Sequence, residues 1–102
     1  MKLFSTTTFL AAAGAVALSL TPALAQQTIK VGSVLSVTGP ASFLGAPEDK
    51  TMRMYVDKIN AAGGINGKKI ELIIYDDGGD ANKARTFATR LVDDDKVVAM
   101  VG

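Results

Sequence analysis

The sequence predicts an α/β fold whose elements follow the order βαβαβ, as in the first part of a doubly wound parallel sheet. Residues 29–37 (IKVGSVLSV) are rich in β-branched side chains, and the Thr-Gly-Pro turn at 38–40 cannot continue a central strand. Two further apolar segments, 70–75 and 97–102, each follow a stretch with helical periodicity. Right-handed crossover connections would place the three strands side by side in parallel.

The first helix is expected to begin near Pro47 and to reach about Ala62. Proline suits a first helical turn, and the two acids that follow it favour the positive end of a helix dipole. Apolar residues recur with i, i+3, i+4, i+7 spacing from Met52 to Ile59, which predicts one buried face. The glycine pair at 63–64 is then expected to end the helix.

The second helix is expected to start at Asp80, a favoured N-cap residue, and to stop near Val92. It carries the same apolar spacing between Ala84 and Leu91. Three acids at 93–95 oppose the negative end of a helix dipole, so they mark its end.

Residues 1–25 are predicted to be a signal peptide. Lys2 forms a short basic region, residues 9–20 an apolar run, and the Ala-Leu-Ala sequence at 23–25 a cleavage signal. A membrane span needs roughly 20 apolar residues, so a membrane anchor or a buried helix is the weaker alternative. Cleavage after Ala25 would release the mature segment 26–102 into the periplasm, and no cysteine lies beside the cleavage site to carry a lipid.

The composition excludes several classes of function. The chain has 11 Lys and Arg against 10 Asp and Glu, and these balance once Lys2 is removed, so nothing indicates binding to nucleic acid or an anionic membrane. Histidine and cysteine are absent, which argues against a zinc site, a disulfide framework and a catalytic triad. Phosphate-loop motifs are missing. Such a motif needs Ser or Thr after Gly-Lys, whereas Gly67-Lys68 is followed by Lys69. We therefore expect no cofactor, no metal and no catalytic residue.

The mature segment 26–102 is small for a parallel α/β domain, whose sheet needs helices on both faces. It also stops within an apolar strand. We therefore expect it to be the N-terminal part of a larger lobe, one that on its own would expose apolar strand edges.

The loop Thr38–Gly45 is the predicted binding site, because ligands of open α/β sheets bind at the carboxyl ends of strands. Its candidate ligand-binding residues combine hydroxyls, backbone N–H groups and apolar side chains, and the helix start that follows favours a carboxylate. They are Thr38, Ser42, Phe43, Leu44 and Gly45. The alternative is an ordinary strand–helix turn with Phe43 and Leu44 packed under the helix, and composition does not decide between the two.

Asp76 and Asp77 follow the second predicted strand and allow two interpretations. Adjacent carboxylates suggest a metal site or a phosphate acceptor, but only Asp80 lies near enough in sequence to assist. Asp side chains also hydrogen-bond their own backbone in turns, and we favour this second interpretation, turn and capping chemistry.

The mature chain resembles the start of the periplasmic solute-binding proteins of branched-chain amino acid transporters. Matching segments occur in the same order along nearly its whole length, and the most specific is INAAGGINGKKIEL. The others are the turn at 38–40, YDD at 75–77, GD at 79–80, KA at 83–84, LV at 91–92, DDKVV at 94–98 and VG at 101–102.

This resemblance implies a periplasmic binding protein type I-like fold with two lobes that close on a solute. It implies delivery to an inner-membrane ABC permease by a protein that is a monomer at full length and not an enzyme. Relatives that bind leucine-type ligands often have an aromatic residue where Leu44 stands, so the expected ligand is a branched-chain amino acid or an amide or aromatic carboxylate. A hydroxyl-rich loop beyond Gly102 would bind the ligand carboxylate. A ligand-sensing domain of a receptor or regulator with the same fold is the alternative.

Overall fold

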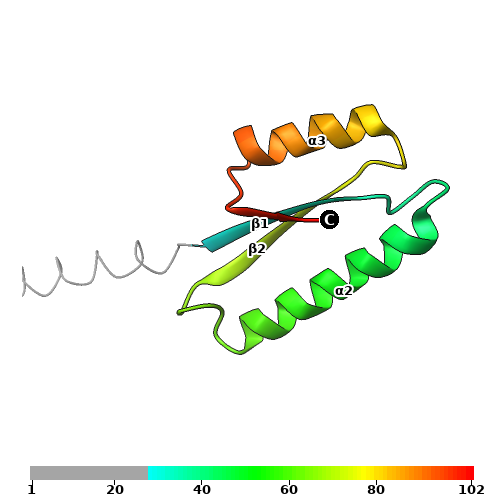
Figure 1. Cartoon of the computed structure of the whole chain (residues 1–102). Coiled ribbons are helices and arrows are strands. Elements are labelled where there is room, and N and C mark those ends of the chain that lie inside the picture. The colour runs from blue at the N-terminus through cyan, green and yellow to red at the C-terminus, as the bar shows by residue number, and fades with distance from the viewer. Residues whose placement is uncertain (1–27) are drawn as a thin grey trace, which may run out of the picture.

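The computed structural model describes residues 28–102, which form a three-stranded parallel sheet with one helix on each face (Figure 1). The predicted signal peptide, residues 1–25, lies outside the described residues. The elements in chain order are β1 (Thr28–Leu35), α2 (Ser42–Ala61), β2 (Lys69–Asp76), α3 (Ala81–Asp93) and β3 (Ala99–Val101). The predicted βαβαβ order is confirmed.

β1 is the central strand, and the sheet order is β2-β1-β3. It pairs with β2 over its full length, from Thr28 opposite Lys69 to Leu35 opposite Asp76. It pairs with β3 over a shorter stretch that ends where Ser33 lies opposite Val101. Since all three strands are parallel, their carboxyl ends lie at one edge of the sheet.

The two helices cover opposite faces of β1. On the α3 face, a Cβ built on Gly32 would lie 2.9 Å from both methyl carbons of Leu91, so the glycine makes room for a fully buried leucine. Successive side chains of a strand point to opposite faces, so Ser33 and Leu35 lie on the α2 face. Leu35 and Leu91 are the buried hydrophobic residues of the described region.

Asn60 joins the end of α2 to the start of β2. Its amide nitrogen donates to the carbonyl of Ile70 at 2.9 Å, and its oxygen accepts the Ile70 N–H at 2.7 Å. Among residues 28–102, β2 is an edge strand, and Asn60 satisfies both backbone groups of Ile70 there. This is a physical reason for the asparagine in the segment INAAGGINGKKIEL.

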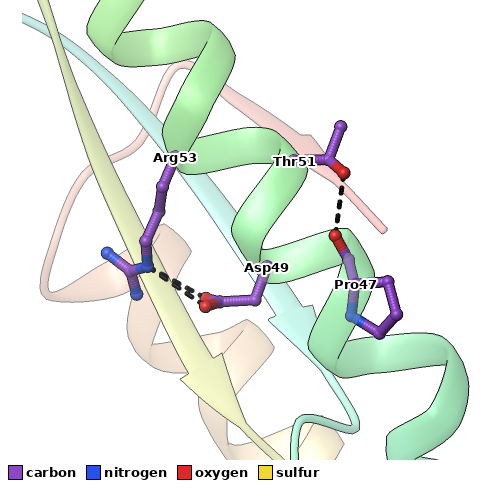
Figure 2. Close-up of polar contacts among 4 residues, drawn as sticks. All are labelled: Pro47, Asp49, Thr51 and Arg53. Atoms are coloured by element: carbon purple, nitrogen blue, oxygen red, sulfur yellow. Dashed lines mark hydrogen bonds and ion pairs between the residues drawn. The ribbon is translucent and has the colours of Figure 1, made fainter.

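Helix α2 begins at Ser42, five residues before the Pro47 start expected from the sequence. Its first turn forms ahead of the proline, because the N–H groups of Leu44 and Gly45 donate to the Ala41 carbonyl at 3.0 and 3.2 Å. Pro47 therefore lies inside the helix, and the expected acidic first turn is wrong. Figure 2 shows the second and third turns, where the Thr51 hydroxyl donates to the Pro47 carbonyl at 2.8 Å and Arg53 pairs with Asp49 at 3.1 Å.

The apolar stripe predicted for this helix is buried only in part. Met52 and Val56 are half-buried, whereas Tyr55 and Ile59 are exposed in the region that the structure describes. Neither helix of residues 28–102 combines the length and the hydropathy needed to cross a bilayer.

The other boundaries differ by one to two residues. β1 ends at Leu35 and not at Val37, since residues 36–38 turn away to meet the end of β2. α3 is capped by Asp80, as predicted, and ends at Asp93. β3 starts at Ala99, two residues later than expected, because the Val97 N–H still donates to the Leu91 carbonyl of α3 at 3.1 Å.

Candidate functional site

The candidate site lies at the carboxyl edge of the sheet, where the loop after β1 meets the loop after β2. The pairing of Leu35 with Asp76 places the two loops side by side. They approach so closely that a Cβ on Gly39 would overlap the Gly78 carbonyl oxygen, and Gly39 adopts a φ of 85° that favours glycine. The loop after β1 and the loop after β2 are therefore packed directly against each other.

Asp76 binds the loop after β1 with both carboxylate oxygens. Oδ1 accepts the N–H groups of Val37 at 2.9 Å, Thr38 at 3.2 Å and Gly78 at 2.9 Å, and Oδ2 accepts the Thr38 hydroxyl at 2.7 Å. The Thr38 hydroxyl, followed by the N–H groups of Gly78 and Thr38, lowers the pKa of Asp76 to about 2. Asp76 is therefore ionised at neutral pH and acts only as an acceptor.

Asp77 makes a second link of the same kind. Its Oδ1 accepts the Ser36 hydroxyl at 2.6 Å and the Gly79 N–H at 2.7 Å. The bonds from Gly78 and Gly79 are the local turn contacts predicted for this acidic pair, and that interpretation is confirmed. The bonds to residues 36–38 were missed, because the partners lie about 40 positions apart in the chain.

The predicted site residues fall into two groups. The Thr38 hydroxyl is engaged with Asp76, whereas the remaining four form the first turn of α2. Phe43 is 73% exposed and Leu44 56% exposed, so the alternative in which both pack under the helix does not hold. Gly45 is buried, and a Cβ there would overlap the Ser36 carbonyl oxygen, so this glycine lets α2 start directly against the end of β1.

The start of α2 has no side-chain cap. Its N-cap residue is Ala41, which has no side-chain acceptor, and the Ser42 N–H donates to the Gly39 carbonyl at 3.1 Å. The N–H of Phe43 has no acceptor among residues 28–102. An uncapped helix start carries partial positive charge, and it favours an anionic group.

A hollow of about 450 Å³ opens on the α2 face of the sheet. Its walls come from the second and third turns of α2 and from the ends of β1 and β3. The lining residues are Leu35, Pro47, Glu48, Thr51, Met52, Val101 and Gly102. None of them was among the predicted site residues, because the prediction confined the site to the loop at 38–45, whereas these residues lie on two strands and on later turns of the helix.

A second hollow, of about 310 Å³, lies on the α3 face and shares Val101 and Gly102 with the first. Asp77 also lines it. No three His, Cys, Asp or Glu side chains within residues 28–102 gather as a metal site would require. The end of β3 is thus flanked by concave surface on both faces.

The sequence pattern of the periplasmic binding protein family matches residues 28–102, which is all of the described structure. The chain belongs to the periplasmic binding protein family. It is 38% identical to the leucine-, isoleucine-, valine-, threonine- and alanine-binding protein of Pseudomonas aeruginosa, over 70% of this chain and 19% of that protein. The chain therefore spans about a fifth of the length of this relative.

Solved structures agree with the fold. The branched-chain amino acid transporter substrate-binding protein LivJ of Streptococcus pneumoniae, in complex with isoleucine, matches with a TM-score of 0.72 and 41% identity, over 74% of this chain and 22% of that one. A fatty acid ABC transporter substrate-binding protein of Thermomonospora curvata matches with a TM-score of 0.68 and 32% identity, over 72% of this chain and 18% of that one. The predicted α/β fold of periplasmic binding protein type I is thus confirmed for residues 28–102.

Proposed function

We propose that this chain is the N-terminal part of the first lobe of a periplasmic solute-binding protein. The complete protein would capture a branched-chain amino acid, or a related small solute with a carboxylate, and deliver it to an inner-membrane ABC permease. The named relatives support this proposal, since they bind amino acids or serve ABC transporters.

The observation that carries the proposal is the start of α2. An uncapped helix N-terminus and two exposed apolar side chains, Phe43 and Leu44, lie together at the carboxyl edge of a parallel sheet. A ligand with an anionic head and an apolar tail complements both features. In the proposed complete protein, a hydroxyl-rich loop after Gly102, as the family resemblance implies, would start at the same edge and bind the carboxylate.

Capture would follow from closure of two lobes. A solute bound at the edge of this lobe would contact the second lobe only in the closed form, so binding shifts the equilibrium toward closure. The first lobe would contribute a preformed wall, because Asp76 and Asp77 hold the loop after β1 through hydrogen bonds within the protein.

The named relatives and the side chain of Leu44 guide the choice of candidate solutes. The named relatives bind isoleucine, other aliphatic amino acids or a fatty acid, which share a carboxylate and an aliphatic chain. Leu44 stands where relatives that bind leucine-type ligands often have an aromatic ring. A flexible aliphatic wall accepts tails of several shapes, so we include amides and aromatic acids among the candidate ligands.

A thermal-shift screen of the full-length protein would test the proposal. The solute panel is L-leucine, L-isoleucine, L-valine, L-phenylalanine, L-glutamine, benzoate and octanoate. At least one member should raise the melting temperature in a concentration-dependent way. If no member binds, the proposed function is wrong. N-terminal sequencing of the periplasmic protein should begin at Gln26, and deletion of the gene should abolish uptake of the solute that binds.

Leu44→Ala should weaken binding of the best panel solute by about 1–3 kcal/mol, the contribution of one buried apolar side chain. Isothermal titration calorimetry measures this change. Val92→Ala is the matched control, because Val92 is an apolar residue with the same 56% exposure on the other helix. An unchanged affinity for Leu44→Ala would remove this residue from the site.

A further inference from the structure

We propose that Asp76 is a positioning residue for the solute site: it holds the loop after β1 in place and fixes Thr38 as a hydrogen-bond acceptor toward the solute. This inference rests on the proposed function. Asp76 itself need not touch the solute, because its two carboxylate oxygens already accept four protein donors.

The first step of the argument is the way the loop is held. Residues 36–41 leave the sheet after Leu35 and lead directly into α2. Within this loop, the N–H groups of Val37 and Thr38 both donate to Asp76. Without the carboxylate these two donors would lose their partner, and water or an altered backbone conformation would replace it.

The second step links the loop to the apolar wall. The loop passes from Thr38 through Gly39 to Ser42, whose N–H donates to the Gly39 carbonyl. Phe43 and Leu44 follow in the first helical turn. A displacement of Thr38 therefore moves the start of α2, so Asp76 controls the position of side chains that it does not contact.

The third step concerns the direction of one hydrogen bond. An ionised carboxylate only accepts, so the Thr38 hydroxyl must give its proton to Asp76 Oδ2, 2.7 Å away. The exposed Thr38 oxygen then has only lone pairs left to offer to a solute. It can accept from an ammonium group, but it cannot donate to a carboxylate, so the loop discriminates in favour of amino acids over simple carboxylic acids.

Asp80 provides a matched control. It lies at the same edge and also accepts two backbone N–H groups, from Asn82 at 2.7 Å and Lys83 at 3.1 Å. These donors belong to α3 and not to the loop after β1. Asp80→Ala therefore removes comparable hydrogen bonds without releasing that loop.

The test uses the full-length protein and two measurements. Amide hydrogen exchange at Val37 and Thr38 reports on the loop without any solute. Calorimetry with L-isoleucine and its des-amino analogue 3-methylpentanoate reports on the discrimination, since the two molecules differ mainly in the ammonium group. L-phenylalanine and 3-phenylpropanoate serve as a second pair if the site prefers aromatic tails.

Asp76→Ala should speed exchange at both amides by about tenfold or more and weaken amino acid binding by about tenfold, the usual scale for losing hydrogen bonds to a charged group. Asp76→Asn keeps an acceptor for the N–H groups but can donate to Thr38, so it should retain most of the amide protection. It should nevertheless lose much of the preference for the amino acid over its des-amino analogue. Asp80→Ala should lower the melting temperature and leave both readouts unchanged.

The inference would be overturned if Asp76→Ala had the same amide exchange rates and the same solute affinities as the parent protein. It would also be overturned if Asp80→Ala weakened binding as much as Asp76→Ala, because the effect would then reflect general destabilisation. If Asp76→Ala fails to fold, Asp76→Asn carries the test through the ratio of the two affinities. Failure of the parent protein to bind any panel solute counts against the proposed function alone, since amide exchange still reports on the loop.

Discussion

Helices α2 and α3 begin at the same edge of the sheet, but their first turns are satisfied in different ways. At α3 the Asp80 side chain accepts the N–H groups of Asn82 and Lys83, and these two bonds lower the pKa of its carboxyl group. At α2 the N-cap is Ala41, which offers no side-chain acceptor. The protein thus supplies its own carboxylate to the start of α3. At α2 it supplies none, and there we propose that the solute carboxylate takes this place.

The two helices also differ in how they pack against β1. α3 fixes itself to β1 through Leu91, which is fully buried above Gly32. The buried residue of α2 is Gly45, which touches the backbone of β1 at the very start of the helix. α3 is therefore anchored by a side chain in its last turn, and α2 by a backbone contact in its first turn, next to the candidate site.

Disrupting the close contact between Gly45 and the Ser36 carbonyl should have the largest effect on stability. Gly45→Ala places a Cβ against the Ser36 carbonyl, which forces the helix start away from β1 and should lower the free energy of unfolding by about 3 kcal/mol. Urea denaturation of the full-length protein measures this loss. The control is Gly67→Ala, which meets no atom within 4 Å and should cost only about 1–2 kcal/mol for its positive φ. Equal losses in the two variants would contradict the close contact.

Giving α2 an Asp at its N-cap, as α3 has, should have the next largest effect, here on solute affinity. Ala41→Asp places a carboxylate at the uncapped helix start, where it would repel an anionic solute and compete for the same N–H groups. Affinity for the best panel solute should fall by about tenfold, equivalent to about 1.4 kcal/mol. Ala41→Asn, which has the same shape without the charge, should bind more tightly than Ala41→Asp in calorimetry. Indistinguishable affinities for the two variants would mean that no anionic group binds there.

A smaller effect on stability should follow from a substitution of Ser33, which lies on the α2 face of β1. Ser33 is fully buried, and its hydroxyl has no hydrogen-bond partner among the described residues. Ser33→Ala should therefore raise the free energy of unfolding by about 1 kcal/mol, because it removes an unsatisfied buried group. Ser36→Ala is the opposite case, since the Ser36 hydroxyl donates to Asp77 and its loss should be destabilising. A destabilised Ser33→Ala protein would show that this hydroxyl has a partner after all.

The smallest expected effect is a change in stability that occurs only at low pH. The pKa of Asp76 lies at about 2 in the folded chain, below the value of about 3.9 for an unfolded aspartate. The stability from ionised Asp76 is thus complete above the unfolded value and is lost as the pH falls from about 4 toward about 2. The stability difference between parent and Asp76→Asn should be constant above about pH 5 and shrink below pH 4. Chemical denaturation at several pH values measures it, and a pH-independent difference would exclude the low pKa.

Much of the fold could be predicted because its signals are local. The period of the apolar residues and the cap at Asp80 each depend on neighbours a few positions away in the chain. The start of α2 was misplaced because Pro47 is a strong local signal for a first turn. The preceding turn forms only because Gly45 can lie against the Ser36 carbonyl, and that contact is tertiary.

The sequence by itself determined the order of strands and helices, since this order depends on apolar spacing and turn residues along the chain. Its motifs carried the resemblance to the family, and it predicted the edge of the sheet at which a solute would bind. Only the tertiary structure decided which groups at that edge are free. The register that puts Leu35 opposite Asp76 commits the N–H groups of Val37 and Thr38 to a carboxylate about 40 residues away. Hydrogen bonds over such a separation depend on how strands pair, and no local pattern encodes that pairing.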